Sequence, residues 1–155
     1  MNGQLPRAQG PWYPWQEIMN NNQPICEVDE YGDKFWRLNG KLHREDGPAV
    51  ECADGYKAWY LNDKRHRVDG PAIEWADGNK FWYLNDNLHR GDGPAIEWAD
   101  GDKEWYLNGK RHREDGPAFE ETNGTKEWYV DGEKIEVPNN DDDIFLRMMN
   151  LKAFW

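Results

Sequence analysis

The residues best suited to chemistry are a histidine, an arginine and an aspartate that occur together in LHREDGPA at residues 42–49. Imidazole and carboxylate groups this close in sequence are typical of acid–base pairs and of metal sites. The same segment recurs with small changes at 65–72, 88–95 and 111–118. All four histidines of the chain lie in it, 23 residues apart. Because an active site is normally single, a fixed period indicates architecture before catalysis.

Neither a metal site nor a catalytic site is favoured by what surrounds these histidines. Neighbouring histidines would lie about 10 Å apart if each repeat adds two strands, which is too far to share one ion. The next acidic position is not kept, because Glu45 becomes Val68 and Gly91. The chain contains no serine, and neither Cys26 nor Cys52 has a neighbouring base in the sequence. We therefore expect no enzymatic activity, no metal and no cofactor.

A structural role is the preferred interpretation of this segment, which joins one β-hairpin to the next. We expect its aspartate to accept hydrogen bonds from turn N–H groups and its histidine to space adjacent hairpins. The residues assigned this role are His43, His66, His89, His112, Asp46, Asp69, Asp92 and Asp115.

The 23-residue period covers residues 25–137 and predicts a repeated hairpin. In the unit 71–86, AIEWA reads as a strand, Asp77-Gly78 as a two-residue turn and KFWYL as the antiparallel partner strand. A second tight turn of the primed type follows, and then a brief third strand before Asp-Gly-Pro. The expected primed turns are Asn39-Gly40, Asn62-Asp63, Asn85-Asp86 and Asn108-Gly109.

Alternation along the strands predicts which side chains are buried. We expect Trp82 and Leu84 to share the buried face with Ile73 and Trp75 of the partner strand. The opposite face then carries a row of tyrosines interleaved with a row of glutamates. These residues are Tyr60, Tyr83, Tyr106, Glu51, Glu74, Glu97 and Glu120.

The pattern W-Y-L-N-G-K-x-H-R-x-D-G-P-A-x-E-x-A-D-G resembles the MORN repeat, in the variant form of phage, bacterial and giant-virus proteins. The resemblance covers residues 25–137 and rests on the NGK turn, the histidine after it and the ADG turn before an aromatic strand. It implies an all-β fold: an elongated, single-layer antiparallel sheet of repeated hairpins, used for protein–protein contact.

The two ends of the chain depart from the repeat. Residues 1–24 are rich in proline and asparagine, and we expect them to form an N-terminal cap segment. In 138–155, Asn140 or Asp141 can cap a helix that continues with apolar residues at near-helical spacing. A short C-terminal helix that seals the last repeat is the preferred interpretation, and a helix that inserts into a partner groove is the alternative.

The net charge of the chain limits the classes of partner that we expect it to bind. The chain has 19 basic and 30 acidic side chains and a formal net charge of −11. Nucleic acid and anionic lipid both require basic surfaces, so we expect no direct nucleic-acid binding and no membrane binding. Two cysteines indicate a reducing compartment, and no apolar run is long enough to span a bilayer. We expect a cytoplasmic protein, or one in the host cytoplasm if the source is a virus.

These observations favour a non-enzymatic protein–protein interaction module. The resemblance implies a small phage-type protein that binds and inhibits or modulates a host protein, with a host defence protein as one target class. The alternatives are an acidic nucleic-acid mimic that inhibits a nucleic-acid enzyme, and a homodimeric scaffold or lipid-surface binder. The expected contacts are the tyrosines and glutamates named above together with Phe145, Met149, Phe154 and Trp155.

Overall fold

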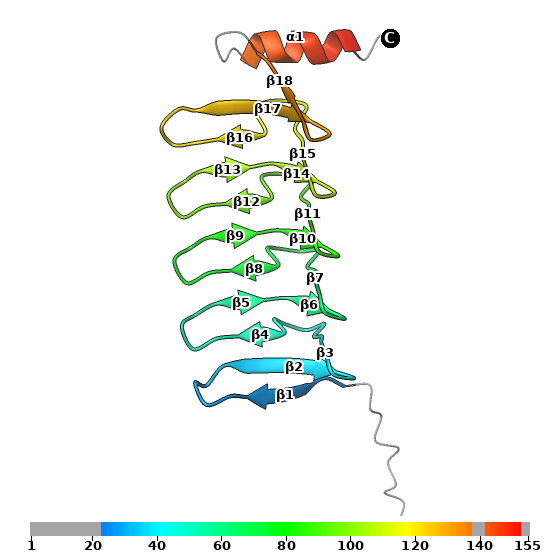
Figure 1. Ribbon diagram of the computed structural model, residues 1–155, viewed down its shortest axis with the longest axis vertical. Helices are drawn as coiled ribbons and strands as arrows, with labels where there is room; N and C mark the ends of the chain where they lie inside the picture. Colours follow the sequence, from blue (N-terminus) through cyan, green and yellow to red (C-terminus); the bar gives the residue numbers. More distant parts are fainter. Residues whose placement is uncertain (1–22, 138–141, 153–155) are drawn as a thin grey trace, which may run out of the picture.

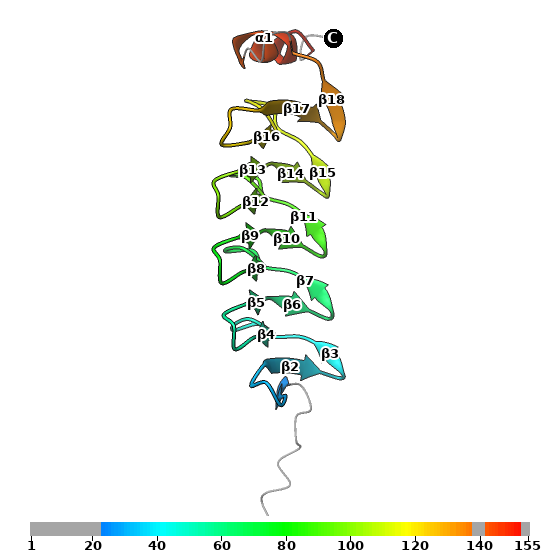
Figure 2. The ribbon, with the colours of Figure 1, turned by 60° about the vertical axis from the view of Figure 1, so that its left-hand side comes forward.

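The repeats stack into one long, open antiparallel β-sheet (Figures 1 and 2). The computed structural model describes residues 23–137 and 142–152. The 12-stranded sheet has the order β1-β2-β4-β5-β8-β9-β12-β13-β16-β17-β18, and β3 pairs with β2 beside this path. Each repeat adds two strands to the stack, which confirms the predicted elongated sheet of repeated hairpins.

The strands of the long sheet are short. They are β1 (Ile25–Val28), β2 (Lys34–Leu38), β3 (Lys41–Leu42), β4 (Val50–Glu51), β5 (Lys57–Ala58), β8 (Ile73–Glu74), β9 (Lys80–Phe81), β12 (Ile96–Glu97), β13 (Lys103–Glu104), β16 (Phe119–Glu120), β17 (Lys126–Val130) and β18 (Glu133–Ile135).

The three central repeats each add a small second hairpin, which lies to the right of the long sheet in Figure 1. These hairpins are β6 (Tyr60–Leu61) with β7 (Lys64–Arg65), β10 (Tyr83–Leu84) with β11 (Asn87–Leu88), and β14 (Tyr106–Leu107) with β15 (Lys110–Arg111). Their turns have positive φ at both central residues, for example 51° at Asn85 and 67° at Asp86. This is the geometry of a type I′ turn, so the predicted primed turns and the predicted third strand are confirmed.

The first hairpin of each repeat differs from the prediction in the length of its loop. The backbone N–H of Trp75 bonds to the carbonyl of Asn79, and that of Gly78 bonds to the carbonyl of Trp75. Three residues, not two, therefore separate the strands, and the last of them is Gly78 with a φ of 102°. A type I turn that ends in a left-handed glycine is the usual three-residue loop. Its register sets Ile73 opposite Phe81, one place from the expected partner Trp82.

That one-residue shift changes which side chains share a face. We call the face that holds Ile73, Phe81 and Tyr83 the core face, because these side chains pack in one cluster. We call the opposite face the ladder face, because it carries paired lysines and glutamates such as Lys80 and Glu74. Trp82 lies on the ladder face, so the expectation that it is buried beside Ile73 is wrong.

The core is thin, as one sheet layer requires. Buried apolar positions before β17 are alanine or β-branched, and the half-buried side chains around them are mostly aromatic, whereas the large buried side chains Trp128 and Phe145 lie at the C-terminal end. The aromatic rings supply the area that a second layer would supply in a sandwich. The buried apolar residues are Ala49, Val50, Ala58, Ala72, Ile73, Ala95, Ile96, Ala118, Trp128 and Phe145.

The helix α1 (Asp142–Lys152) crosses the C-terminal end of the stack above β17 (Figures 1 and 2). Phe145 is fully buried, and its ring centroid lies 6.2 Å from that of Trp128. The Lys126 ammonium lies 2.9 Å from the Asp142 carboxylate. The helix thus covers β17 with an apolar and an ionic contact, as the predicted cap would. The expected capping residues Asn140 and Asp141, and the segment 1–22, lie outside the described residues.

Candidate functional site

The HRxDGP segment is built around its arginine, which contacts four other groups of the chain. In the second repeat, Arg67 Nε donates to Asp69 Oδ1 at 3.0 Å, and Nη1 donates to the Pro71 carbonyl and to Glu74 Oε1. The guanidinium lies 4.1 Å above the ring of Trp59. The same contacts recur at Arg44, Arg90 and Arg113.

The aspartate of this segment therefore has a different role from the predicted one. Its side chain accepts a hydrogen bond from the arginine two residues earlier, and not chiefly from turn N–H groups. The hydrogen bond from Arg67 holds the pKa of the Asp69 carboxyl below its ordinary value of 3.8. The aspartate holds the guanidinium over the tryptophan, so the aspartate and the arginine both contribute to the packing of the segment that connects two hairpins.

The glycine between the aspartate and the proline makes room for the guanidinium. A Cβ atom at Gly47, Gly70, Gly93 or Gly116 would lie between 2.8 and 3.0 Å from the Cζ atom of the arginine in its own segment. None of these four glycines has a positive φ, so close approach and not backbone conformation is the reason for glycine here.

The histidines do more than space the hairpins, because each one contacts the next repeat. His66 Nδ1 lies 3.0 Å from Asn85 Oδ1, and the Asn85 backbone N–H donates to the same nitrogen at 3.3 Å. The asparagine is the first residue of the next type I′ turn, so the imidazole secures that turn across the repeat boundary. The pairs His43–Asn62, His89–Asn108 and His112–Asp131 repeat the arrangement.

Shallow hollows separate successive HRxDGP segments on the ladder face. They have volumes between 560 and 720 Å³ and are lined by a tryptophan, a leucine, a histidine and arginines. In one of them Trp82 and Leu84 line the wall together with His89 and Arg90. The polar groups there are already bonded within the protein. In the described ranges, no group of three or more His, Cys, Asp or Glu is arranged to hold a metal ion.

The glutamates and tyrosines chosen as contacts lie on opposite faces of the sheet. Glu74 lies opposite Lys57 and Lys80 on the ladder face, whereas Tyr83 packs on the core face beside Ile73. The expected interleaved surface is therefore not formed, and the tyrosines are half-buried. The lysine–glutamate alternation continues along the whole stack: Lys34, Glu51, Lys57, Glu74, Lys80, Glu97, Lys103, Glu120 and Lys126.

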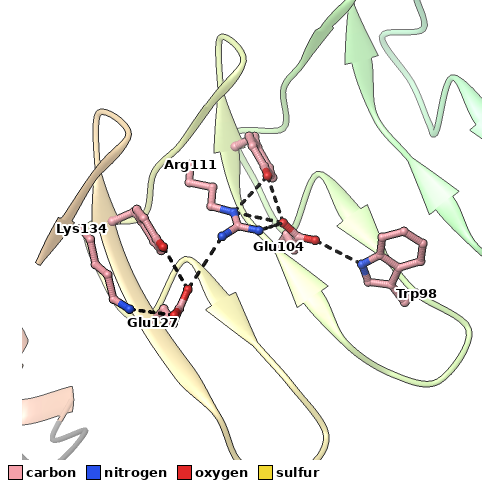
Figure 3. Close-up of polar contacts among 7 residues, drawn as sticks. Trp98, Glu104, Arg111, Glu127 and Lys134 are labelled. Carbon is pink, nitrogen blue, oxygen red and sulfur yellow. Dashed lines mark hydrogen bonds and ion pairs between the residues drawn. The ribbon is translucent and has the colours of Figure 1, made fainter.

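A polar cluster interrupts the apolar core face near its C-terminal end (Figure 3). Glu104 is 7% exposed and occupies the place of Ala58 and Phe81 in earlier repeats. Arg111 Nη2 donates to Glu104 Oε2 at 2.7 Å, and the Tyr106 hydroxyl and the Trp98 indole N–H also donate to this carboxylate.

The cluster extends into the last repeat through a second glutamate. Arg111 Nη1 lies 3.8 Å from Glu127 Oε2, and Lys134 Nζ donates to Glu127 Oε1 at 2.7 Å. Burial acts to lower the pKa of Arg111, but its hydrogen bonds to Tyr106 and Glu104 raise that pKa overall. The hydrogen bond from Lys134 lowers the pKa of Glu127. Charges at this site are matched internally, so it stabilises one arrangement of the last repeats.

Two tryptophans are exposed on the core face, and one of them, Trp75, was expected to be buried. Trp75 is 48% exposed and Trp98 is 37% exposed. Trp75 makes an edge contact with Tyr56 at a centroid distance of 4.7 Å, and Trp98 makes one with Phe81 at 5.2 Å. We call these four residues the aromatic row. The row lies along the hairpin loops. The side chains at this position differ from one repeat to the next, and that variation is the sequence feature that could have identified the row.

The remaining predicted contacts and the thiols are placed as follows. Phe145 has no exposed surface, so its assignment as a partner contact is corrected to a contact with Trp128. Met149 is partly exposed, and Phe154 and Trp155 lie outside the described residues. Burial raises the pKa of the Cys52 thiol to about 11, which makes it a poor nucleophile at neutral pH.

Comparison with protein-family models and with curated proteins finds no match to the chain. The arrangement of repeated antiparallel hairpins in a single sheet is compatible with a MORN-like repeat fold. No helix in the described part of the chain is long and apolar enough to cross a membrane.

Proposed function

We propose that this protein is a non-enzymatic protein-binding module and that its aromatic row contacts the partner. The supporting observation is the exposure of Trp75 and Trp98 on a sheet face that no second layer covers within residues 23–137 and 142–152. Tryptophan is strongly enriched among the residues that dominate binding energy at interfaces. The rings are held by edge contacts with their neighbours, so little side-chain entropy is lost when a partner binds.

The arginines and histidines of the HRxDGP segments support binding over catalysis, because their polar atoms already contact other groups of the protein. Arg67 contacts four other groups of the protein, and His66 contacts the turn of the next repeat. These contacts make a stiff scaffold that presents side chains at fixed intervals. Stacked repeats of this kind serve as extended binding surfaces.

The concrete form of the proposal is a small phage-type protein that binds and inhibits or modulates a host protein, with a host defence protein as one target class. This form rests on the resemblance of the repeats to phage-type variants. It predicts a cytoplasmic partner, since the chain is acidic and carries two free cysteines in its described part.

The mimicry of nucleic acid is supported less well than protein binding. The ladder glutamates are matched by lysines opposite and by arginines such as Arg90, whose Nη1 lies 2.8 Å from Glu97 Oε1. Duplex DNA carries a charge about every 1.7 Å along its axis, whereas the repeats here recur about every 10 Å. The charge density of the stack is therefore much lower than that of the duplex it would imitate.

Pairing with a second copy is the other use that a specific observation favours. Within the described residues, the strand β1 pairs with β2 alone, and all four of its residues are exposed. Its apolar residues Ile25 and Val28 are 71% and 61% exposed. An exposed edge strand is a template for pairing with another chain. Sedimentation tests this: a single monomeric species at all concentrations rules the dimer out, and Val28→Lys should abolish a dimer that does form.

The test of protein binding compares affinity capture by the wild type and by Trp75→Ala/Trp98→Ala. A captured protein should be purified and its affinity for both forms measured, with a loss of about 100-fold in the variant. Val68→Ala is the matched control, because Val68 is 82% exposed but lies in the HRxDGP segment. Equal affinity of the wild type and the double variant for that protein would overturn the proposed binding surface.

A further inference from the structure

The hairpin loops of the long sheet form an acidic edge, stacked at the left of Figure 1. The loops are residues 29–33, 53–56, 76–79, 99–102 and 122–125, and they contain no lysine or arginine. Their acidic residues are Asp29, Glu30, Asp33, Asp54, Asp77, Asp100 and Asp102.

These seven carboxylates differ from the other acidic groups of the repeats. None of them lies within 4.0 Å of a cationic side chain of the described residues, whereas the ladder glutamates and the HRxDGP aspartates pair with arginines. Their contacts are with uncharged donors: Asp54 Oδ1, for example, accepts the Tyr56 N–H at 2.9 Å. Seven carboxylates without a cationic partner in the described residues therefore lie along this one edge.

The acidic edge adjoins the aromatic row. Trp75 immediately precedes the loop that holds Asp77, and Trp98 and Asp100 occupy the same places one repeat later. An exposed indole attracts a lysine or arginine cation over its face, and an adjacent carboxylate adds a charge of the right sign. Two successive repeats thus each carry an exposed indole two residues before a loop carboxylate, and the two sets lie about 10 Å apart.

We propose that the acidic edge and the aromatic row bind a basic, extended protein segment that runs along the stack. The inference rests on the proposed protein-binding function and names the chemistry of the partner. In a polyproline II segment, three residues advance about 9.3 Å and return to the same side. A lysine or arginine at every third position therefore meets successive loops of the sheet. Because this advance of about 9.3 Å is close to the spacing of about 10 Å between successive loops, an extended segment fits this edge.

The probe is a fluorescent peptide of four Arg-Pro-Pro triplets, measured by fluorescence anisotropy at an ionic strength of about 0.1 M, where the Debye length is about 10 Å. We expect it to bind, and the affinity to fall about tenfold in Asp54→Asn/Asp77→Asn/Asp100→Asn. Asparagine preserves the loop, because Asn123 occupies this place in the last repeat and its Oδ1 accepts the Thr125 N–H at 2.7 Å. Absence of binding to the wild type would overturn the proposal.

The control triple variant is Glu45→Gln/Glu114→Gln/Glu133→Gln, which removes the same charge from exposed sites outside the hairpin loops. Its affinity for the peptide should stay within about twofold of the wild type, because charges beyond a Debye length are screened. An equal loss in both triple variants would show attraction by net charge only. Equal or tighter binding of a peptide with four contiguous arginines, or of duplex DNA, would also overturn the proposal.

This inference and the proposed function fail in different ways. If Trp75→Ala/Trp98→Ala loses a captured protein partner while Asp54→Asn/Asp77→Asn/Asp100→Asn binds it as the wild type does, protein binding stands and the basic segment is excluded. If the captured partner is indifferent to the tryptophans but the triplet peptide binds and depends on the aspartates, the acidic edge is a binding site and the proposed function has the wrong surface.

Discussion

The guanidinium of Arg67 lies 4.1 Å above the ring of Trp59, and Glu74 accepts a hydrogen bond from its Nη1 atom. A tryptophan on a single-layer sheet has no second layer to cover it, and the arginine takes over that function. Its methylene groups and planar head shield the ring while its charge is matched by two carboxylates. The repeated HRxDGP segment is thus a means of covering one aromatic side chain per repeat.

Gly93→Ala should lower the free energy of unfolding by about 1 kcal/mol, because the new Cβ displaces the Arg90 guanidinium from Trp82. Gly91→Ala is the matched control two residues away, where a Cβ would meet nothing within 4 Å. This control should be neutral or stabilising by up to about 1 kcal/mol, since alanine restricts the unfolded chain. Urea denaturation of both variants measures the difference, and equal effects would contradict the steric argument.

The imidazole of His66 should be coupled energetically to the turn that it contacts in the next repeat. A double-mutant cycle with His66→Ala and Asn85→Gly should show a coupling of about 0.5–1.5 kcal/mol in chemical denaturation. Glycine is chosen because it accepts the positive φ of 51° at position 85. The cycle of His66→Ala with Asn108→Gly is the control, and comparable coupling there would mean that the contact is not specific.

Arg111→Leu alone should destabilise the protein by about 3 kcal/mol, because the buried Glu104 carboxylate loses its charge partner. Glu104→Phe/Arg111→Leu should restore most of that loss, since it reproduces the Phe81 and Leu88 pair of the preceding repeat. Thermal and urea unfolding of the three proteins measure the effect. A double variant as unstable as the single one would show that the cluster contributes more than matched charge.

Phe145→Ala should cost about 3–4 kcal/mol, because a fully buried ring is removed from its contact with Trp128. Leu146→Ala is the control in the same helix, where the side chain is 38% exposed and the cost should stay below about 1 kcal/mol. Urea denaturation followed by the fluorescence of the chain's ten tryptophans measures the free energy of unfolding of both variants. Similar stabilities of the two variants would be inconsistent with a capping helix.

Acid should weaken the joints between the hairpins. Hydrogen bonds from the neighbouring arginines hold the pKa of three HRxDGP aspartates below the ordinary value of 3.8. A depressed pKa contributes stability that is complete above the ordinary value and is lost as the pH falls through the lower folded value. The melting temperature should therefore fall as the pH drops below about 4, and it should fall less steeply when the three are replaced by asparagine. The three residues are Asp46, Asp69 and Asp92.

Local sequence patterns were sufficient for the period, the type I′ turns and the terminal helix. Asn-Gly and Asn-Asp pairs tolerate the positive φ that these turns require, so the turn follows from two residues alone. The acidic start and apolar spacing of 142–152 likewise depend only on near neighbours. The contacts of His66 with Asn85 join residues 19 positions apart, and only the stacking of repeats brings them together.

The tertiary structure decided which face each side chain occupies. Asp77-Gly78 is compatible with a two-residue or a three-residue loop, and the difference of one residue exchanges the two faces of the strand. The observed loop sets Ile73 opposite Phe81, moves Trp82 to the face of Arg90 and leaves Trp75 exposed. The strand register is determined by the packing of both faces along the whole stack. The sequence of a single repeat does not contain that information. The sequence determined the repeat and its turns, and the packing determined which surface remains for a partner.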